Sequence, residues 1–349
     1  MLSLLPRQKR KDSKNRASTE PGAVHDVVCF NVFERHPHHV PPDKERPMRS
    51  FSNVPAKLAE ALTVVGSPSW PIADAVHDYQ NVYRRLLRRL ELMLGDKPLS
   101  ECRILDLGCG YTYPNTALLH SAGLRVSGVD VQAAFFRDGR RAAFRSRRAE
   151  KGYLKACYHA GPRYSCHATF FTTLSALAGR PIDHMALDIR RYDGHRLPFS
   201  DGSFDVVISN AVLEHVRDLP LFVSETSRVM RPGAVLDMLW HNFYAPSGGH
   251  LQDYEVAQSP WGHVTGESHL CTYLNRKRPH EIRNAFDSQL EVLRIVGASK
   301  DHSLVGDPAF SFEGDRLLDE SWIRRLPDIP REEFVTRSYL IQATKPSRA

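Results

Sequence analysis

Strand-like apolar runs alternate with helical stretches from residue 103 onward, and this alternation is the feature that most limits the fold. "RILDLG" at 103–108 precedes a helical stretch at 114–121, and "RVSGVD" follows at 125–130. "FDVVISN" at 204–210 precedes a second helical stretch at 219–230. Strands separated by helices pair in parallel, because the helix carries the chain back to the same end of the sheet. The sequence therefore predicts a doubly wound α/β sheet.

Four more segments complete the predicted sheet. The third strand is weakly marked and falls within 183–189 or 189–192. The fifth, "AVLDMLWHN" at 234–242, follows Pro232-Gly233, and 289–296 and 338–345 close the series. The prediction is a mainly parallel, seven-stranded sheet, with room for an antiparallel strand at its end.

The chain divides into an arm and one large domain. Residues 1–68 are rich in Pro, Arg and His with only weak periodicity, so they are predicted to be a basic, largely irregular or disordered arm. The predicted domain, 69–349, opens with an amphipathic helix at 72–94, where apolar residues recur every three or four positions. Its core is placed at 100–240, and a substrate lid with the C-terminal strands at 241–349.

An insertion at 132–187 separates the second and third predicted strands and is longer than most such connections. Helical spacing covers its first half, and "YSCHATFFTTLSALAG" at 164–179 predicts another helix. Nine Lys/Arg stand against two acids in 137–163. These cations fit either a phosphorylated or carboxylated substrate or a solvated helix face. The ones on one side of the helix are Arg137, Arg141, Arg145 and Arg148.

The loop in "ILDLGCGYTYPN" has the form of a ligand-binding turn between a strand and a helix. Gly108 and Gly110 match the first two glycines of a dinucleotide loop, but Tyr113 stands where the third belongs. No Gly-Lys-Ser/Thr follows, so the phosphate-binding loop of nucleotide hydrolases is also excluded. Asp106 would repel phosphate and suits a ligand with a cationic amine.

Residues 102–240 resemble a class I S-adenosylmethionine-dependent methyltransferase of the type 11 kind, with a Rossmann-like fold. "LDLGCGYT" is similar to the family's first motif, although Thr112 replaces its third glycine. "VSGVD" resembles the second motif, which closes on Asp130. "DGHRLPFSDGSFDVVISNAVLEHV" resembles the adenine-contact block, and "RVMRPGAVL" the turn into the fifth strand.

The resemblance implies S-adenosylmethionine as cofactor and assigns a part of it to each matched position. Asp106 would bind the amino group, and Asp130 both ribose hydroxyls. Asp193 would accept a hydrogen bond from the adenine amino group, although Asp188 is the alternative for this role. Leu197-Pro198-Phe199 follows Asp193 at the family's distance and favours it. The expected cofactor-binding residues are Asp106, Gly108, Gly110, Asp130, Val131, Asp193, Gly194 and Asn210.

Three histidines are the candidates for catalysis. His215 follows the fourth strand and is a candidate general base. Some family members bind a metal through Glu-x-x-Glu-His, but Ala211 occupies the first position here, so no metal is predicted. The stretch from 241 to 263 is rich in aromatic residues and histidines, and it follows the fifth strand, where ligands bind in open α/β sheets. His241 and His250 are predicted to contact the acceptor.

These features predict methyl transfer to a small-molecule O, N or C nucleophile, which would be acidic or phosphorylated if the arginines hold it. One alternative is an RNA methyltransferase, suggested by the sequence pI of about 9.1 and the arginine-rich helix, although no RNA-binding module is recognised. Another is a regulatory protein that binds the cofactor without catalysis. No apolar run approaches 18 residues, and the six cysteines lack metal spacing, so a reduced, cytoplasmic protein is expected.

Overall fold

The computed structural model describes residues 69–347, except 133, 135, 252, 269, 271 and 319. The arm predicted at 1–68 lies outside the described residues. Across the described ranges, no helix is both long enough and apolar enough to cross a membrane.

The core is one sheet of seven strands in the order β3-β2-β1-β4-β5-β7-β6. The strands β1 to β5 pair in parallel, and β7 runs antiparallel to both of its neighbours. The predicted doubly wound, mainly parallel sheet is therefore confirmed. The strands are β1 (Arg103–Leu107), β2 (Arg125–Asp130), β3 (Asp188–Arg191), β4 (Phe204–Asn210), β5 (Met230–His241), β6 (Glu291–Ala298) and β7 (Ser338–Thr344).

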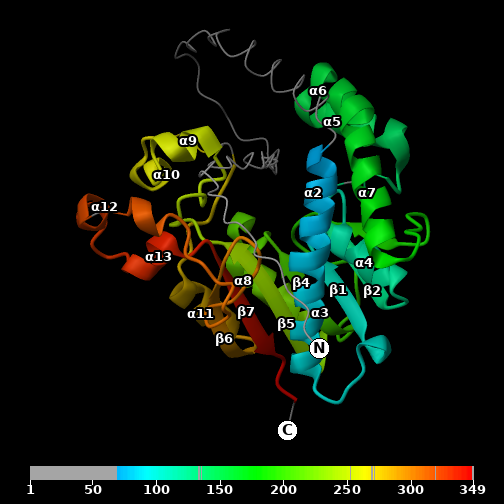
Figure 1. The fold of residues 1–349 in the computed structure, drawn as a ribbon. Helices are drawn as coiled ribbons and strands as arrows, with labels where there is room; N and C mark the ends of the chain where they lie inside the picture. The colour runs from blue at the N-terminus through cyan, green and yellow to red at the C-terminus, as the bar shows by residue number, and fades with distance from the viewer. Residues whose placement is uncertain are drawn as a thin grey trace, which may run out of the picture.

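Helices cover both faces of the sheet (Figure 1). The first predicted helix is continuous from 69 to 94 but contains a π-helical turn, and α7 of the insertion lies beside its first part. The elements up to the insertion are α2 (Ser69–His77), η2 (Asp78–Tyr83), α3 (Arg84–Leu94), η3 (Leu99–Glu101), α4 (Pro114–Ser121), α5 (Gly139–Lys151), α6 (Tyr153–Tyr158), η4 (His159–Arg163) and α7 (Tyr164–Ala178). Those that follow are η5 (Leu213–His215), α8 (Leu219–Val229), α9 (Asp253–Gln258), α10 (Gly262–Thr265), α11 (Pro279–Asp287), η6 (Asp315–Leu317), α12 (Glu320–Arg325) and α13 (Arg331–Val335).

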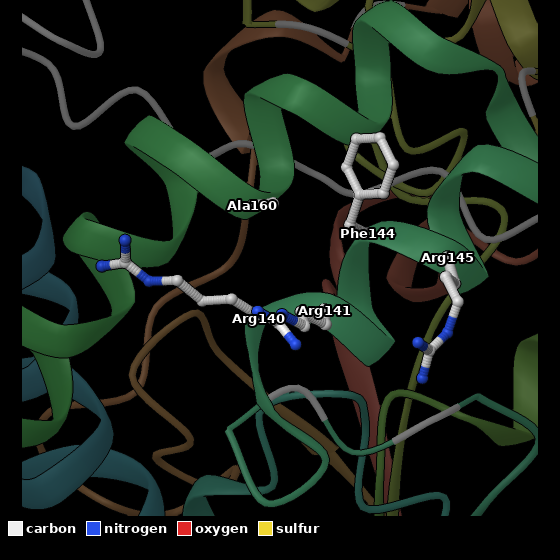
Figure 2. Close-up of a pocket in the computed structure, with 5 residues that line it drawn as sticks. All are labelled: Arg140, Arg141, Phe144, Arg145 and Ala160. Carbon is white, nitrogen blue, oxygen red and sulfur yellow. The ribbon is translucent and has the colours of Figure 1, made fainter.

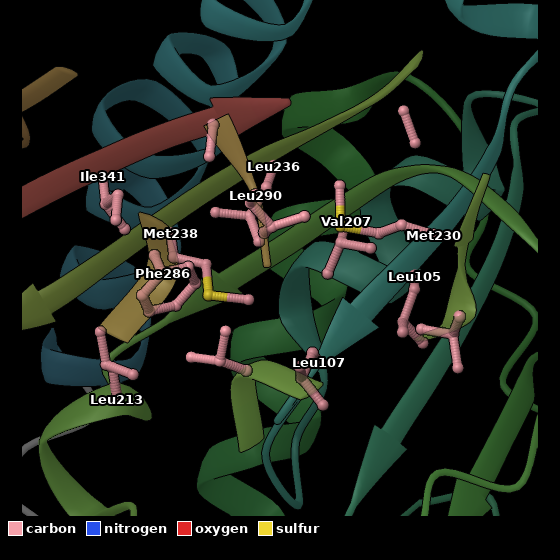
Figure 3. Close-up of a cluster of buried hydrophobic side chains, with 14 of the residues drawn as sticks. Leu105, Leu107, Val207, Leu213, Met230, Leu236, Met238, Phe286, Leu290 and Ile341 are labelled. Carbon is pink, nitrogen blue, oxygen red and sulfur yellow. The ribbon is translucent and has the colours of Figure 1, made fainter. Parts of the chain in front are cut away.

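Successive strand residues feed two separate cores, one on each face of the sheet. Leu105, Val207 and Leu236 pack on the side of α8 and α11, where Phe286 is fully buried (Figure 3). Ile104 and Val206 point the other way, into a cluster with residues of α3, α4 and α7. Burial on both faces explains why these strands read as continuous apolar runs.

The third predicted strand is Asp188–Arg191, and the fifth is longer than predicted. It begins at Met230, so Pro232 and Gly233 lie within it. The pairing of β4 with β5 is irregular there, and a proline is tolerated at such a bulge. The short helices α9 to α13 were not predicted, because Gly and Pro interrupt the apolar periodicity in that part of the chain.

A buried ion pair fastens the N-terminal helix to the centre of the sheet. The Arg89 guanidinium of α3 donates to both carboxylate oxygens of Asp237 on β5, at 2.8 and 2.9 Å. Gln342 on β7 donates to the same carboxylate at 2.7 Å. Hydrogen bonds between side chains therefore join α3 to β5, and they add to the backbone pairing of β5 with β7.

Candidate functional site

A cavity of about 440 Å³ opens at the carboxyl ends of the parallel strands. It lies where the strand order reverses between β1 and β4, the usual ligand crevice of an open α/β sheet. Each of the eight predicted cofactor residues lines it, as does His215. Its walls also include Cys109, Gln132, Tyr192, His195, Val212, Arg217 and Phe222.

The glycine loop after β1 is shaped by a close contact at Gly108, which leaves no room for a side chain, and by hydrogen bonds to Asp130. Gly108 has φ +74°, and a Cβ there would lie 2.3 Å from Cγ2 of Val212. The Gly110 N–H donates to the Asp130 carboxylate at 2.9 Å, and the Gln132 N–H donates to its other oxygen at 2.8 Å. Asp130 therefore holds the loop in place as well as lining the cavity.

Tyr113 stands at the position where a dinucleotide-binding loop has its third glycine. Its φ of +45° is in the left-handed region that a glycine would adopt easily. The side chain is fully buried against Phe171 of the insertion, and its hydroxyl lies 3.2 Å from Nδ1 of His184. The departure at this position thus packs the helical insertion onto the loop.

Two carboxyl groups, the buried Asp106 and the half-buried Asp130, give the floor of the cavity its chemistry. Asp106 accepts a 2.7 Å hydrogen bond from the Thr116 hydroxyl, and burial raises the pKa of Asp106 to about 6. Burial also raises the pKa of Asp130, although the N–H groups of Gln132 and Gly110 oppose this. Such a floor favours a cationic or hydroxyl-bearing ligand over a phosphate.

The other wall is formed by the loop after β3. Asp193 lines the cavity, and the N–H groups of His195 and Arg196, donating to its Oδ1, lower its pKa. Gly194 has φ +87°, and a Cβ there would lie 3.8 Å from the Val131 side chain. Asp188 does not line the cavity, because it bonds the Ser127 hydroxyl and Arg190 at the sheet surface.

Asn210 and His215 stand where β4 ends. Within the described part of the chain, the buried Oδ1 of Asn210 accepts no hydrogen bond, so this oxygen is open to a donor from a ligand. Next to it, Ala211 has φ +55°, a strained conformation for a residue with a Cβ. His215 Nδ1 lies 3.0 Å from the Tyr273 carbonyl oxygen.

His241 and His250, the two predicted acceptor contacts, do not line the cavity. They lie behind its wall, where the His250 ring meets the edges of His215 and His241 at centroid distances of 5.1 and 5.0 Å. Glu214 completes this group, with all three donor atoms within 4.8 Å of one another. Burial and His215 lower the pKa of His250 to about 3, and burial holds the pKa of His241 well below its usual range.

The stretch from 241 to 263 is anchored by buried hydrogen bonds. The Trp261 indole N–H lies 3.1 Å from the Tyr244 carbonyl oxygen and 3.2 Å from that of Phe334. The His263 Nε2 lies 2.7 Å from the Phe243 carbonyl oxygen. Trp261 and Phe334 share an apolar cluster with residues of α12 and α13. Trp261 and His263 are therefore fixed in position by buried contacts.

The arginines of the insertion form a separate, shallow pocket on α5. Arg140, Arg141 and Arg145 line it together with Phe144 and Ala160 (Figure 2). It shares no lining residue with the cavity at β1 and β4. Arg137, predicted to belong to this set, instead bonds the Ile189 carbonyl oxygen and Asp138.

Some lining residues were not predicted. Tyr192 and Gln132 follow directly after β3 and β2, and Val212 and Phe222 come after β4. Position after a parallel strand was the signal available, because such residues converge at one edge of the sheet. Their exact selection depends on loop paths that no local pattern specifies.

Residues 168–237 match a protein family described as methyltransferase domain. An "uncharacterized methyltransferase" of Mycobacterium sp. (strain KMS) is 34% identical over 100 residues, which are 29% of this chain and 37% of the relative. One of Mycobacterium avium (strain 104), with the same name, is 32% identical over 151 residues, 43% of this chain and 56% of the relative. The chain thus spans less than two thirds of the length of these curated relatives.

Solved structures of methyltransferases are similar only in outline. An S-adenosylmethionine-dependent methyltransferase from Mesorhizobium loti has a TM-score of 0.38 at 15% identity, covering 81% of this chain and 100% of that chain. A geranyl diphosphate C-methyltransferase from Streptomyces coelicolor A3(2) has a TM-score of 0.40 at 16% identity, covering 82% and 87%. Values this low support no particular acceptor. The family match thus covers residues 168–237, which run from α7 into β5 of the observed sheet.

Proposed function

We propose that the protein transfers a methyl group from S-adenosylmethionine to a small-molecule nucleophile. The observation that carries this proposal is the convergence of the eight predicted cofactor residues, from the ends of β1, β2 and β4 and the loops after β1, β2 and β3, on one cavity. The cavity's volume is within the usual range for small-molecule sites. The cofactor also fits the chemistry of the lining, because it carries an ammonium group and a ribose diol and lacks phosphate.

Each part of the lining has a role in holding this cofactor. Asp106, on the floor, is the acceptor for the ammonium group. The Asp130 carboxylate accepts the ribose hydroxyls while keeping the Gly110 amide in place. Val131 and Gly194 flank the adenine, and Asp193 accepts from its amino group. The backbone at Gly108 passes under the ligand, where a side chain would collide with Val212.

When bound, the cofactor supplies a methyl group activated by its sulfonium. The chain's part is to align the acceptor in line with that methyl and to exclude water. Asn210 offers its buried Oδ1 to a donor on the acceptor or the cofactor. His215, in the wall, is the proposed base for an acceptor that must lose a proton. Arg217 is the arginine in this lining, so it is the proposed contact for an acidic acceptor.

Calorimetry with S-adenosylhomocysteine tests the proposal directly. One molecule is expected to bind per chain, and NAD at the same concentration is expected not to bind. Preferential binding of NAD would contradict the cofactor assignment. Strong, salt-sensitive binding of mixed RNA would instead support the RNA methyltransferase alternative. Cofactor binding without methyl transfer to any class of acceptor would favour the regulatory alternative.

Cofactor affinity is expected to fall as the pH falls through about 6. The raised pKa of Asp106 means that its carboxylate takes up a proton near that pH, and the neutral acid holds an ammonium group weakly. S-adenosylhomocysteine should bind about tenfold more weakly at pH 5 than at pH 7. Stability responds in the opposite direction: because the folded pKa exceeds the ordinary 3.8, protonation of Asp106 favours the native state.

The matched control for this pH dependence is Asp106→Asn. This variant should bind more weakly at pH 7 and show a flatter profile, measured by calorimetry from pH 5 to pH 8. If the slope persists in the variant, Asp130, whose pKa is also raised, carries it instead. A flat profile in the wild-type protein would show that Asp106 does not face the ammonium group.

A further inference from the structure

A carboxylate and two imidazoles meet behind the acceptor side of the cavity. Glu214 belongs to the short turn after β4, His241 ends β5, and His250 follows in the next loop. Their donor atoms lie within 4.8 Å of one another, and Oε1 of Glu214 lies 3.9 Å from Nε2 of His250. That separation is too long for a hydrogen bond. Two ligands of a tetrahedral zinc ion, each about 2.1 Å from it, lie roughly 3.4 Å apart, so these side chains would close by about half an ångström around an ion.

Glu214 is the residue of this group whose burial is not offset by hydrogen bonds of normal geometry within the described residues. Its side chain is 3% exposed, and neither carboxylate oxygen makes a hydrogen bond of normal geometry within the described residues. The main-chain N–H groups of Glu214 and His241 only moderate the rise in pKa that burial causes. A buried carboxylate is costly unless it is paired or coordinates a metal. The fold thus places the Glu214 carboxylate, which lacks such hydrogen bonds, beside two imidazoles.

The loop that carries His250 is built to place it there. His250 has φ +54°, an unfavourable conformation for a residue with a Cβ, and its N–H donates to the Ser247 carbonyl oxygen at 3.0 Å. A Cβ on Gly248 would lie 2.2 Å from the Asn242 carbonyl oxygen, and one on Gly249 would lie 2.6 Å from the His263 ring. The two glycines thus allow a tight turn that brings His250 against Glu214.

We propose that Glu214, His241 and His250 bind one divalent transition-metal ion beside the methyl-transfer cavity. One carboxylate and two neutral imidazoles form the ligand set of several catalytic zinc sites, which leave one position open. Magnesium prefers oxygen ligands and is disfavoured by the two nitrogens. Because the His250 ring meets His215, which lines the cavity, an ion held here would lie next to the acceptor side of the cavity.

The ligand set differs from the Glu-x-x-Glu-His arrangement considered from the sequence. That pattern would use His215 and a residue at the position of Ala211. Here His215 is outside the cluster, and the chain after β5 supplies the two imidazoles. The sequence analysis considered only that pattern, so the metal site proposed here uses a different set of ligands. Binding of the ion is independent of the proposed function, and only its role toward the acceptor depends on it.

Metal titration of the full chain tests the site without any assay of activity. Metal-stripped protein should bind one Zn²⁺ that Glu214→Gln abolishes, with affinity falling by more than about 100-fold, beyond the effect of an outer-sphere change. Co²⁺ should give the visible absorption of a nitrogen- and oxygen-ligated ion in the wild type only. The histidines of "RHPHHV" can also bind zinc, so only the zinc lost in Glu214→Gln is counted.

Thermal unfolding and a neighbouring histidine provide the controls. Zn²⁺ should raise the midpoint of the wild type and leave that of Glu214→Gln unchanged. Without zinc, Glu214→Gln should unfold no earlier than the wild type, because it removes a buried charge. His215→Gln should retain the zinc, and His250→Ala should lose it. Zinc binding by Glu214→Gln equal to that of the wild type would overturn the proposal.

Binding of S-adenosylhomocysteine by the same proteins separates the two proposals. Zinc loss with intact cofactor affinity is the result expected for Glu214→Gln and His250→Ala. Zinc binding in a wild-type protein that does not bind S-adenosylhomocysteine would refute the proposed function and leave the metal site standing.

Discussion

Replacing Arg89 with leucine is expected to lower the free energy of unfolding by about 3–5 kcal/mol. The Arg89 guanidinium forms a two-pronged pair with Asp237, whose side chain is 1% exposed. Without it, a carboxylate remains buried beside Gln342 alone. The loss is large because this charge would have neither water nor a cation to stabilise it.

Urea unfolding monitored by circular dichroism measures this effect, and Arg88→Leu is the matched control. Arg88 is adjacent on α3 but exposed, so its replacement should change stability by less than about 0.5 kcal/mol. Replacing Arg89 and Asp237 together with leucine should recover part of the loss, because no charge then remains buried. Equal stability of Arg89→Leu and the wild type would show that the pair does not hold α3 to the sheet.

Asp130→Ala is expected to weaken S-adenosylhomocysteine binding at least about tenfold, since a hydrogen bond to a charged group contributes roughly 1.5–3 kcal/mol. The variant would lose the acceptor for the ribose hydroxyls. It would also release the Gly110 N–H, which Asp130 holds at 2.9 Å. Asp130→Asn keeps one acceptor oxygen and should fall between the wild type and the alanine variant.

Calorimetry checks this ranking, and Asp188→Ala serves as the control. Asp188 lies on the neighbouring strand β3 but outside the cavity lining, so its loss should leave the affinity unchanged. Asp193→Ala, compared with Asp188→Ala in the same measurement, shows which of these two acids binds the adenine amino group. Unchanged binding by Asp130→Ala would refute the ribose assignment.

The strands of the sheet and several residues that line the cavity could be predicted from local sequence patterns. Apolar runs such as 204–210 are long enough, and bounded clearly enough, to identify strands that are buried on both faces. A residue just after a parallel strand must lie at the carboxyl edge of the sheet. That is why Asp106, Asp130 and Asn210 could be placed together from the sequence, and each lines the cavity.

The bounds of β5 and the short helices after it were harder to predict from the sequence. Pro232 and Gly233 suggested a turn, but the register shift between β4 and β5 accommodates them inside the strand. Local propensity cannot anticipate this, because it depends on the pairing partner. The same applies to α10, α12 and α13, whose apolar residues pack on each other across gaps in the sequence, and to α11, which packs against the sheet.

The sequence by itself determined the class of fold and the strands, which follow from periodicity, and it identified the acids that line the cavity through the resemblance of their motifs and their position at or after strand ends. Only the tertiary structure decided which histidines meet Glu214. It placed His241 and His250 together behind the wall and left His215 in the lining. It also paired Arg89 with Asp237 across 148 residues of chain. Contacts between residues far apart in sequence depend on how loops and helices pack, and no local pattern encodes that packing.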